Sequence, residues 1–169
     1  MSREKIYILD SSAILSGKPI DLNGRIVIPE SVEKEVMRED PKLFDLIQGK
    51  DVSLEHPSRE SLSLVREAAE KMGESRRLSK VDKEVIAVAL DNMGRGDVCI
   101  ITDDYSIQNV ASFLGLKFRG LSEKGITKRF IWRFRCRGCK KIFKKFYPSC
   151  PDCGSELKPI VRKKDKVEL

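Results

Sequence analysis

The stretch 79–114, SKVDKEVIAVALDNMGRGDVCIITDDYSIQNVASFL, decides the fold class of this chain. Apolar residues at helical spacing predict a helix over 79–93, and two glycines end it. The run 98–102 is rich in β-branched residues, which is typical of a strand buried on both faces. A second helix is expected over 104–114. The stretch therefore predicts a helix, a central strand and a further helix in succession.

The same alternation of short apolar strands and helices extends to both sides of this stretch. Strands are expected at 6–9, 25–28, 52–55 and 116–118. Helices are expected to start near Ala13 and to cover 30–38, 41–48 and 61–72. Elements that alternate in this way predict an α/β fold, in which helices cover both sides of a parallel sheet.

The composition changes after residue 121. Residues 1–121 contain 18 Lys/Arg and 21 Asp/Glu, a net charge of −3, whereas residues 122–169 contain 15 and 5, a net charge of +10. Such asymmetry predicts that the second part binds a polyanion. Gly125 and its polar neighbours suggest a mobile connection. We expect an α/β domain over 1–121, a linker over 122–128, a small β-type module over 129–161 and a basic tail over 162–169.

Composition also excludes several classes of protein. No apolar run approaches the roughly 18 residues of a membrane-spanning helix, and the N-terminus lacks the pattern of a signal peptide. We therefore expect a cytoplasmic protein that does not contact membranes and needs no small-molecule cofactor. The single histidine, His56, leaves little room for a Ser-His-Asp triad or a multi-histidine metal site. Carboxylates or cysteines are expected to carry any chemistry.

Four of the five cysteines form two Cys-x-x-Cys pairs, Cys136/Cys139 and Cys150/Cys153, separated by ten residues. Two such loops bring four thiolates to one ion, which predicts a tetrahedral site for a single structural Zn²⁺. Two disulfides are the alternative, which a cytoplasmic location disfavours. A catalytic dithiol would need only one pair. Cys99, within the central strand, is expected to be a buried small hydrophobe.

Basic and aromatic side chains alternate around these cysteines. Basic groups contact phosphates and aromatic faces stack on unpaired bases, so this pattern favours binding of nucleic acid. The aromatic residues are equally suited to form the small core of the module. The residues expected to bind RNA are Arg133, Arg135, Arg137, Lys140, Lys141, Lys144 and Lys145.

Acidic residues lie where the expected strands end or the expected helices begin. Asp10 follows the first strand, Asp103 and Asp104 follow the central strand, and Asp82 opens the strongest helix. Active sites of open parallel sheets form at the carboxyl ends of the strands. Carboxylates gathered there need a cation, and Mg²⁺ or Mn²⁺ suits oxygen ligands. The ordinary explanation is that these residues cap helices and that Glu35 faces solvent.

The segments ILDSSAIL (8–15), VEKEV (32–36), LSKVDKEVIAVAL (78–90) and CIITDDYSIQNVA (99–111) resemble the acidic motifs of PilT-N-terminus (PIN) ribonuclease domains. The resemblance covers roughly residues 4–120. With a four-cysteine zinc ribbon behind it, the chain is similar to the Nin-one-binding endonucleases of ribosome maturation in their short archaeal form. This resemblance implies a three-layer PIN domain with a central parallel sheet. It also implies an endoribonuclease that matures the 3′ end of small-subunit rRNA, in the pre-ribosomal small subunit with its assembly factors.

The resemblance also assigns roles to residues. The acids of the family fall on Asp10, Glu35, Asp82 and Asp104, with Asp103 adjacent. Asp10, Asp82 and Asp104 would hold one or two Mg²⁺ or Mn²⁺ ions, and Glu35 would complete or orient the set. The usual Thr-x-Asp pattern favours Asp104 over Asp103, and Glu33 is a weaker rival to Glu35. Hydrolysis would leave 5′-phosphate and 3′-hydroxyl ends, with the zinc ribbon positioning the RNA.

Three rival functions stay open at this point. A toxin-like PIN ribonuclease would act on tRNA or mRNA, although such toxins are usually a bare PIN domain. A non-catalytic RNA-binding assembly factor would use the acids only as helix caps. A flap-type DNA nuclease is the third, because similar acidic clusters cut DNA and nothing in the sequence reads the 2′-hydroxyl.

Overall fold

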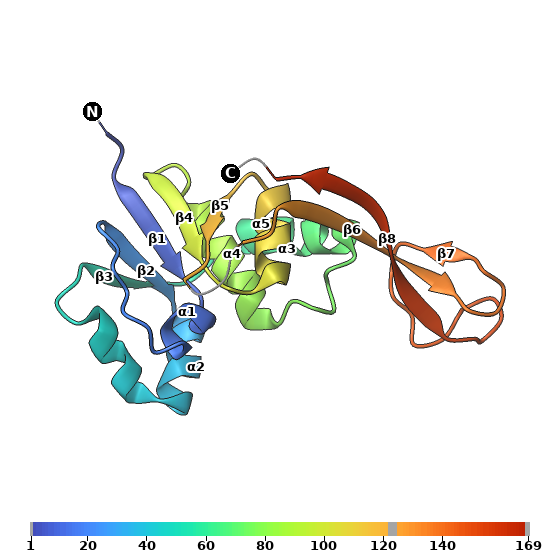
Figure 1. The fold of residues 1–169 in the computed structure, drawn as a ribbon, viewed down its shortest axis with the longest axis horizontal. Helices are drawn as coiled ribbons and strands as arrows, with labels where there is room; N and C mark the ends of the chain where they lie inside the picture. Colours follow the sequence, from blue (N-terminus) through green and yellow to red (C-terminus); the bar gives the residue numbers. More distant parts are fainter. Residues whose placement is uncertain (1, 122–124, 168–169) are drawn as a thin grey trace.

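The structure is a computed structural model that describes residues 2–121 and 125–167. The chain forms an α/β domain and an antiparallel arm that extends from one side of it (Figure 1). Part of the expected linker, 122–124, lies outside the described residues. Within the described residues, no helix is long and apolar enough to cross a bilayer.

The α/β domain contains five strands and six helical segments. The strands are β1 (Lys5–Leu9), β2 (Arg25–Pro29), β3 (Val52–Glu55), β4 (Asp97–Ile101) and β5 (Lys117–Arg119). The helices are α1 (Ser11–Leu15), α2 (Glu30–Glu39), the 3₁₀ helix η1 (Pro41–Ile47), α3 (Arg59–Met72), α4 (Lys80–Asn92) and α5 (Tyr105–Phe113). These elements lie close to their predicted positions, which confirms the α/β class.

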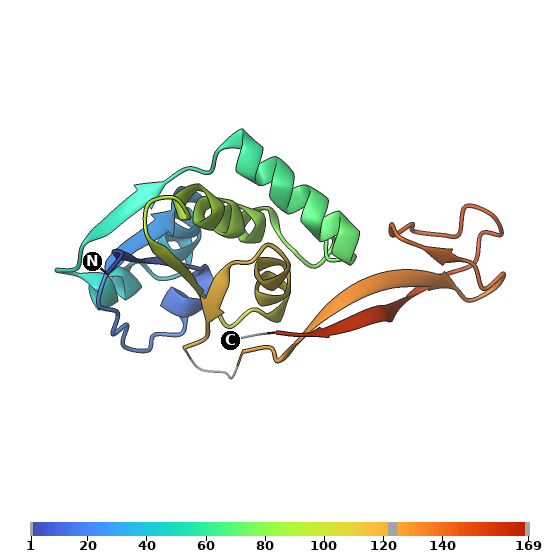
Figure 2. The same cartoon turned by 90° about the horizontal axis from the view of Figure 1, so that it is seen from above.

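The five strands form one parallel sheet in the order β3-β2-β1-β4-β5. The chain steps from β1 to β2 in one direction and from β3 to β4 in the other. Right-handed crossovers therefore place α1 and the α3–α4 pair on opposite faces of the sheet (Figure 2). Because all strands run the same way, their C-terminal ends share one edge, which we call the carboxyl edge. The strand order reverses at β1 and β4, where such sheets bind ligands.

The core lies around the two central strands and α4. The side chains of Ile6, Ile8 and Ile100 are fully buried. All five residues from Val85 to Ala89 of α4 are also buried, because this helix packs against α3, α5 and the sheet. Cys99 lies in β4 as expected but is only half-buried. Because α4 packs against other elements on several sides, apolar residues recur along its sequence, and this gives the clearest helix pattern in the chain.

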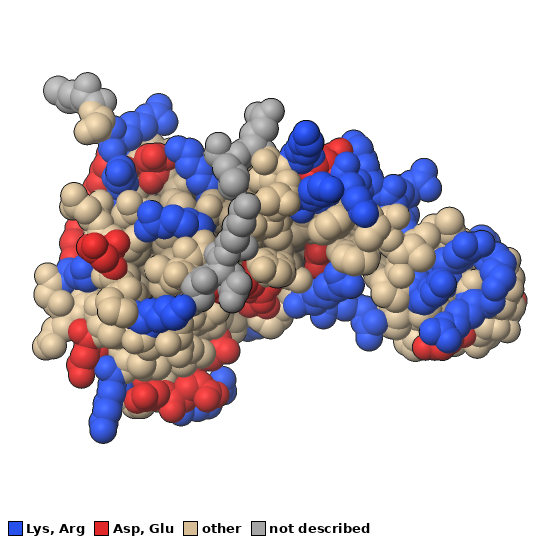
Figure 3. All heavy atoms as spheres, in the orientation of Figure 1, with Lys and Arg blue, Asp and Glu red and all other residues tan. Residues whose placement is uncertain are grey.

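The arm is built from β6 (Lys128–Cys136), β7 (Ile142–Phe143) and β8 (Leu157–Lys166), in the order β7-β6-β8. β6 and β8 pair antiparallel from Lys128 opposite Lys166 to Cys136 opposite Leu157. Residues 162–166, for which the run of charges predicts a basic tail, form the end of β8. Lys and Arg side chains crowd the arm, whereas acids and bases are mixed on the α/β domain (Figure 3). The domain boundaries themselves stay predictions.

A buried polar cluster docks the base of the arm on α3 and α5. The side chain of Glu74 is only 2% exposed, and its Oε1 accepts hydrogen bonds from Asn109 Nδ2 at 2.7 Å and Trp132 Nε1 at 2.9 Å. Asn109 also pairs with the backbone N–H and carbonyl of Phe130, at 2.8 and 2.9 Å. The guanidinium of Arg77 lies 3.9 Å from the centre of the Trp132 ring. These contacts fix β6 to the α/β domain, although the linker sequence suggested mobility.

Candidate active site and metal centre

Asp10 lies directly after β1 and is 2% exposed. Its backbone N–H donates to the carbonyl of Ile101 at 3.1 Å, which ties the residue to the end of β4. Its carboxylate accepts hydrogen bonds from the backbone N–H of Ser11 at 2.8 Å and from the hydroxyls of Ser12 at 2.8 Å and Thr102 at 2.7 Å. An ionised carboxylate has about four acceptor positions, so about one stays open.

The electrostatics of Asp10 favour a bound cation. Burial raises the pKa of Asp10, and the negative charge of Asp82 raises it further, against the lowering effect of the three hydrogen bonds. No Lys or Arg among the described residues neutralises Asp10. A buried carboxylate without a positive partner is costly unless it is protonated or binds a cation. The effect of Asp82 on the pKa of Asp10 also indicates that the two carboxylates are close enough to interact.

Asp82 and Asp104 cap helices, as the ordinary explanation of the acids requires. Asp82 forms a capping box with Ser79: its Oδ2 accepts from the N–H of Ser79 at 2.7 Å, and its own N–H donates to the Ser79 hydroxyl at 3.1 Å. Asp104 Oδ1 accepts from the N–H groups of Ser106 at 2.7 Å and Ile107 at 3.2 Å. Each carboxylate uses one oxygen for its cap. The second oxygen accepts no hydrogen bond from the described residues, so capping leaves it available for a metal.

Asp103 and Glu35 lie in different surroundings. Asp103 Oδ1 accepts from the backbone N–H of Leu121 at 3.0 Å, which fastens the chain after β5 to the carboxyl edge. Glu35, on α2, lines a cavity of about 320 Å³ together with Lys80 and Val81 from the first turn of α4. That turn also carries Asp82, so Glu35 faces the same end of α4.

The acids supply only carboxylate oxygens, which are the ligands that Mg²⁺ and Mn²⁺ prefer. Among the described residues, however, one group of His, Cys, Asp or Glu side chains is compact enough to bind a metal without rearrangement, and it consists of the four Cys-x-x-Cys cysteines. Like charges spread apart when nothing neutralises them. The donor chemistry of Asp10, Asp82 and Asp104 therefore fits a divalent cation, which would draw the carboxylates together.

The four cysteines form the compact cluster that their spacing predicts. All four sulfur atoms lie within 4.8 Å of one another, and Cys136–Cys153 and Cys139–Cys150 are 3.3 and 3.7 Å apart. Sulfur atoms around a tetrahedral zinc ion lie about 3.8 Å apart, given zinc–sulfur bonds of about 2.3 Å. The cysteines are free thiols rather than disulfides. The cluster can therefore hold one metal ion such as zinc.

The two cysteine loops have matching backbones. The N–H of Cys136 donates to the carbonyl of Lys141 at 2.9 Å, and the N–H of Cys150 donates to that of Ser155 at 2.8 Å. The fifth residue of each loop, Lys140 or Gly154, has a left-handed backbone with φ of 66° or 75°. The hydroxyl and backbone N–H of Ser155 lower the pKa of Cys153 to about 6, which favours the thiolate that a metal binds.

The basic residues expected to bind RNA differ in what they contact. Arg137 pairs with Glu156 at 3.4 Å and Lys141 with Asp152 at 2.6 Å. Arg133 donates from Nη1 to the carbonyls of Lys71 and Trp132, and Lys140 donates to the carbonyl of Arg137. Arg135, Lys144 and Lys145 form no ion pair with a carboxylate of the described residues.

Sequence reasoning missed the polar residues that support the carboxyl edge. Thr102 is fully buried and donates to Asp10, while its backbone carbonyl accepts from Gln108 Nε2 at 2.8 Å. Gln108 Oε1 in turn accepts from the backbone N–H of Ile126 at 2.9 Å, so this buried side chain links the start of the arm to the edge. A signal was present, since Gln108 and Asn109 are large polar side chains between the apolar residues Ile107 and Val110 of this helix.

Comparisons with known proteins agree with this architecture. A family model described as the PIN domain of ribonuclease matches residues 7–91, which include Asp10, Glu35 and Asp82. The chain is 40% identical over 160 residues to Endoribonuclease Nob1 of Archaeoglobus fulgidus, covering 94% of this chain and 92% of the relative. It is 41% identical over 159 residues to Endoribonuclease Nob1 of Pyrococcus abyssi, covering 92% and 94%. It is 40% identical over 153 residues to Ribonuclease VapC1 of Thermoplasma acidophilum, covering 90% and 77%.

Proposed function

The chain belongs to the PIN-domain ribonuclease family and is a nuclease, and from this premise we propose that it is a metal-dependent endoribonuclease of ribosome assembly. Its substrate in this proposal is small-subunit precursor rRNA within the pre-ribosomal particle, cut at the mature 3′ end. The observation that carries the proposal is the placement of Asp10 and Asp104 at the adjoining ends of β1 and β4, with the Asp82 charge acting on Asp10.

Asp10, Asp82 and Asp104 would each serve both as part of a helix cap and as a metal ligand. Asp10, Asp82 and Asp104 hold Mg²⁺ or Mn²⁺ with the acceptor positions that their caps leave open, and Glu35 completes or orients the set. A divalent cation bound there neutralises the carboxylates and supplies Lewis acidity for hydrolysis of a phosphodiester. Thr102 and Ser12 orient the carboxylate of Asp10 through their hydroxyls. Asp103 holds the chain after β5 in place, which supports Asp104 as the ligand.

The arm would supply RNA affinity, because the carboxyl edge by itself repels phosphates. A single structural zinc ion held by the cysteine cluster keeps the two loops folded, and four protein ligands leave it no open position for catalysis. The basic surface of the arm then binds and positions the RNA.

Cleavage of a short RNA that spans the small-subunit 3′ end tests this function. We expect wild-type cleavage with Mn²⁺, and loss of cleavage with largely unchanged RNA binding in Asp10→Asn. Asp21→Asn is the matched control, since Asp21 is an exposed acid outside the proposed ligand set. Full activity in Asp10→Asn would overturn the assignment, and binding without any cleavage by the wild type would favour the non-catalytic assembly factor.

The similarity to Ribonuclease VapC1 favours one second candidate, a toxin-like ribonuclease that acts on other RNAs. The two candidates differ in their partners. Purification of the tagged chain from its source organism should recover small-subunit ribosomal particles if our proposal holds. Recovery of a small inhibitor protein in their place would favour the toxin-like function.

A further inference from the structure

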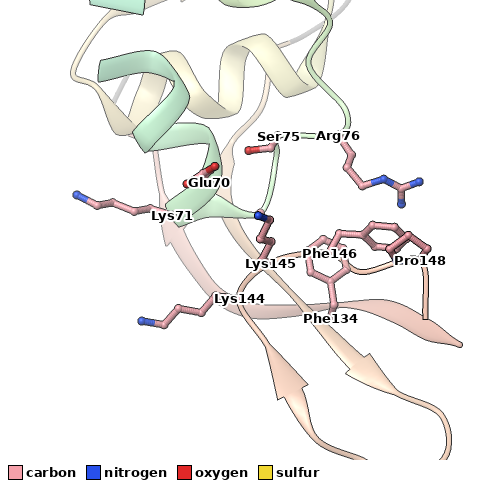
Figure 4. A pocket seen from close by; sticks show the side chains of 10 residues that line it. Glu70, Lys71, Ser75, Arg76, Phe134, Lys144, Lys145, Phe146 and Pro148 are labelled. Carbon is pink, nitrogen blue, oxygen red and sulfur yellow. The ribbon is translucent and has the colours of Figure 1, made fainter. Parts of the chain in front are cut away.

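A cavity of about 610 Å³ lies where the arm leaves the α/β domain, and we call it the interdomain cleft. One wall is the end of α3 with the residues after it, including Lys71 and Arg76, and the other is formed by β6 and the segment after β7, including Lys144 and Lys145 (Figure 4). This volume is typical of small-ligand sites in proteins. Neither module forms the cleft alone.

The floor of the cleft is aromatic and its rim is basic. Phe134 and Phe146 pack edge to face with ring centres 5.4 Å apart, and the guanidinium of Arg76 lies 3.4 Å from the centre of the Phe146 ring. Lys71 and Lys144 extend on the same side of the cleft from opposite walls (Figure 4). Glu70 is the single acidic residue in the lining. Planar apolar surface beside clustered cations suits a nucleotide, which combines a base with a phosphate.

The cations of the cleft keep their charge available for an anionic ligand, although the guanidinium of Arg76 also stacks on the Phe146 ring. Arg137 and Lys141 of the arm are already paired with acids. In contrast, Arg76, Lys144 and Lys145 are exposed and form no ion pair within 2–121 and 125–167. Positive charge is therefore less compensated in the cleft than around the cysteine loops, which favours an anionic ligand there.

The α/β wall of the cleft continues along the chain to the start of α4, which carries Asp82. The loop that carries Arg76 joins α3 to α4, and Lys83 of α4 holds it by donating from Nζ to the carbonyl of Ser75 at 3.4 Å. The same loop ends at Ser79, which caps α4 and exchanges two hydrogen bonds with Asp82. An RNA strand bound in the cleft therefore lies next to the segment that carries Asp82, a proposed metal ligand.

We propose that the interdomain cleft binds a nucleotide of single-stranded RNA, with the base beside the Phe146 ring and the neighbouring phosphates on Arg76, Lys144 and Lys145. The proposal rests on the proposed endoribonuclease function. It assigns the cleft as a substrate-binding site outside the acidic site. Both modules contribute residues to this binding site, so the docking of the arm is part of substrate binding.

The test compares two triple variants of the full chain in binding a fluorescent ten-nucleotide oligouridylate, without added divalent cations. Arg76→Ala/Lys144→Ala/Lys145→Ala removes the cleft cations, and the control Lys158→Ala/Lys163→Ala/Lys164→Ala removes as many exposed charges from β8. We expect the cleft variant to bind about tenfold more weakly than the control, and its slope of log K against log salt to be shallower by about 2, from roughly 0.7 per phosphate contact. Zinc content and circular dichroism check that both variants are folded.

Photo-crosslinking locates the nucleotide independently. Wild-type protein with a 4-thiouridine oligonucleotide should cross-link within 70–76 or 134–148, and the cleft variant should lose this product. Equal affinity and salt slope in the two triple variants, or cross-links confined to other segments, would overturn the proposal. Cleavage of the 3′-end RNA by the wild type, measured in parallel, decides the proposed function separately, because a nuclease that grips RNA elsewhere would still cleave.

Discussion

Replacement of Asn109 by alanine should loosen the arm from the α/β domain. Asn109 is 3% exposed and forms two hydrogen bonds with the backbone of Phe130 and one with the carboxylate of Glu74. Two neutral hydrogen bonds at about 1 kcal/mol each and one to a charged group at about 2 kcal/mol amount to about 4 kcal/mol. The better helix propensity of alanine returns about 0.5 kcal/mol. A net loss of about 3.5 kcal/mol lowers the Tm of a chain of this size by roughly 7–14 °C.

The assay is thermal unfolding followed by the fluorescence of Trp132, the single tryptophan of the chain, which donates to Glu74 in the same cluster. Amide ¹⁵N relaxation should show one tumbling time for both modules in the wild type and faster tumbling of the arm in Asn109→Ala. The exposed Asn23→Ala serves as control and should match the wild type. A fall in Tm of less than about 2 °C, with unchanged Trp132 emission and common tumbling, would refute the docking argument.

Three further outcomes are expected. Burial raises the pKa of Asp10, so the stabilising protonated form is lost as the pH rises through that pKa. Asp10→Asn should therefore raise the Tm by a few degrees at neutral pH and by less in acid. An equal or lower Tm of this variant at neutral pH would contradict the buried charge. Removal of zinc by a chelator should release four reactive thiols while Trp132 emission stays constant, because that side chain is held by Glu74; a red shift would show that the base of the arm depends on the metal. Gly73→Ala should cost about 2 kcal/mol in urea unfolding, since φ is +71° and a Cβ would lie 2.6 Å from the carbonyl oxygen of Trp132; wild-type stability would be inconsistent with this close contact.

The helix caps at the carboxyl edge could be predicted from neighbouring residues alone. A carboxylate just before a helix or in its first turn predicts a cap from the sequence, and Asp10, Asp82 and Asp104 all take part in caps. Local reasoning treated capping and metal binding as alternatives. The structure removes that conflict, because each cap leaves an acceptor position open on a carboxylate.

Long-range pairing of side chains was beyond the sequence. Asn109 and Glu74 lie 35 residues apart, and their meeting with Phe130 depends on how α3, α5 and β6 pack. Residues 162–166 look like a basic tail because their charges hide the strand pattern, and only pairing with β6 makes them a strand. Hydrogen bonds between distant segments leave no periodic signal along the chain.

The sequence by itself determined the alternation of strands and helices, the four-cysteine cluster and the division of charge, because each arises from the spacing or the sum of neighbouring residues. Tertiary structure alone decided that the arm is docked and that Arg76 meets Phe146 across the interdomain cleft. It also decided which basic side chains are already paired. These features are distances between residues remote in the chain, and such distances are set by packing of the two modules rather than by local pattern.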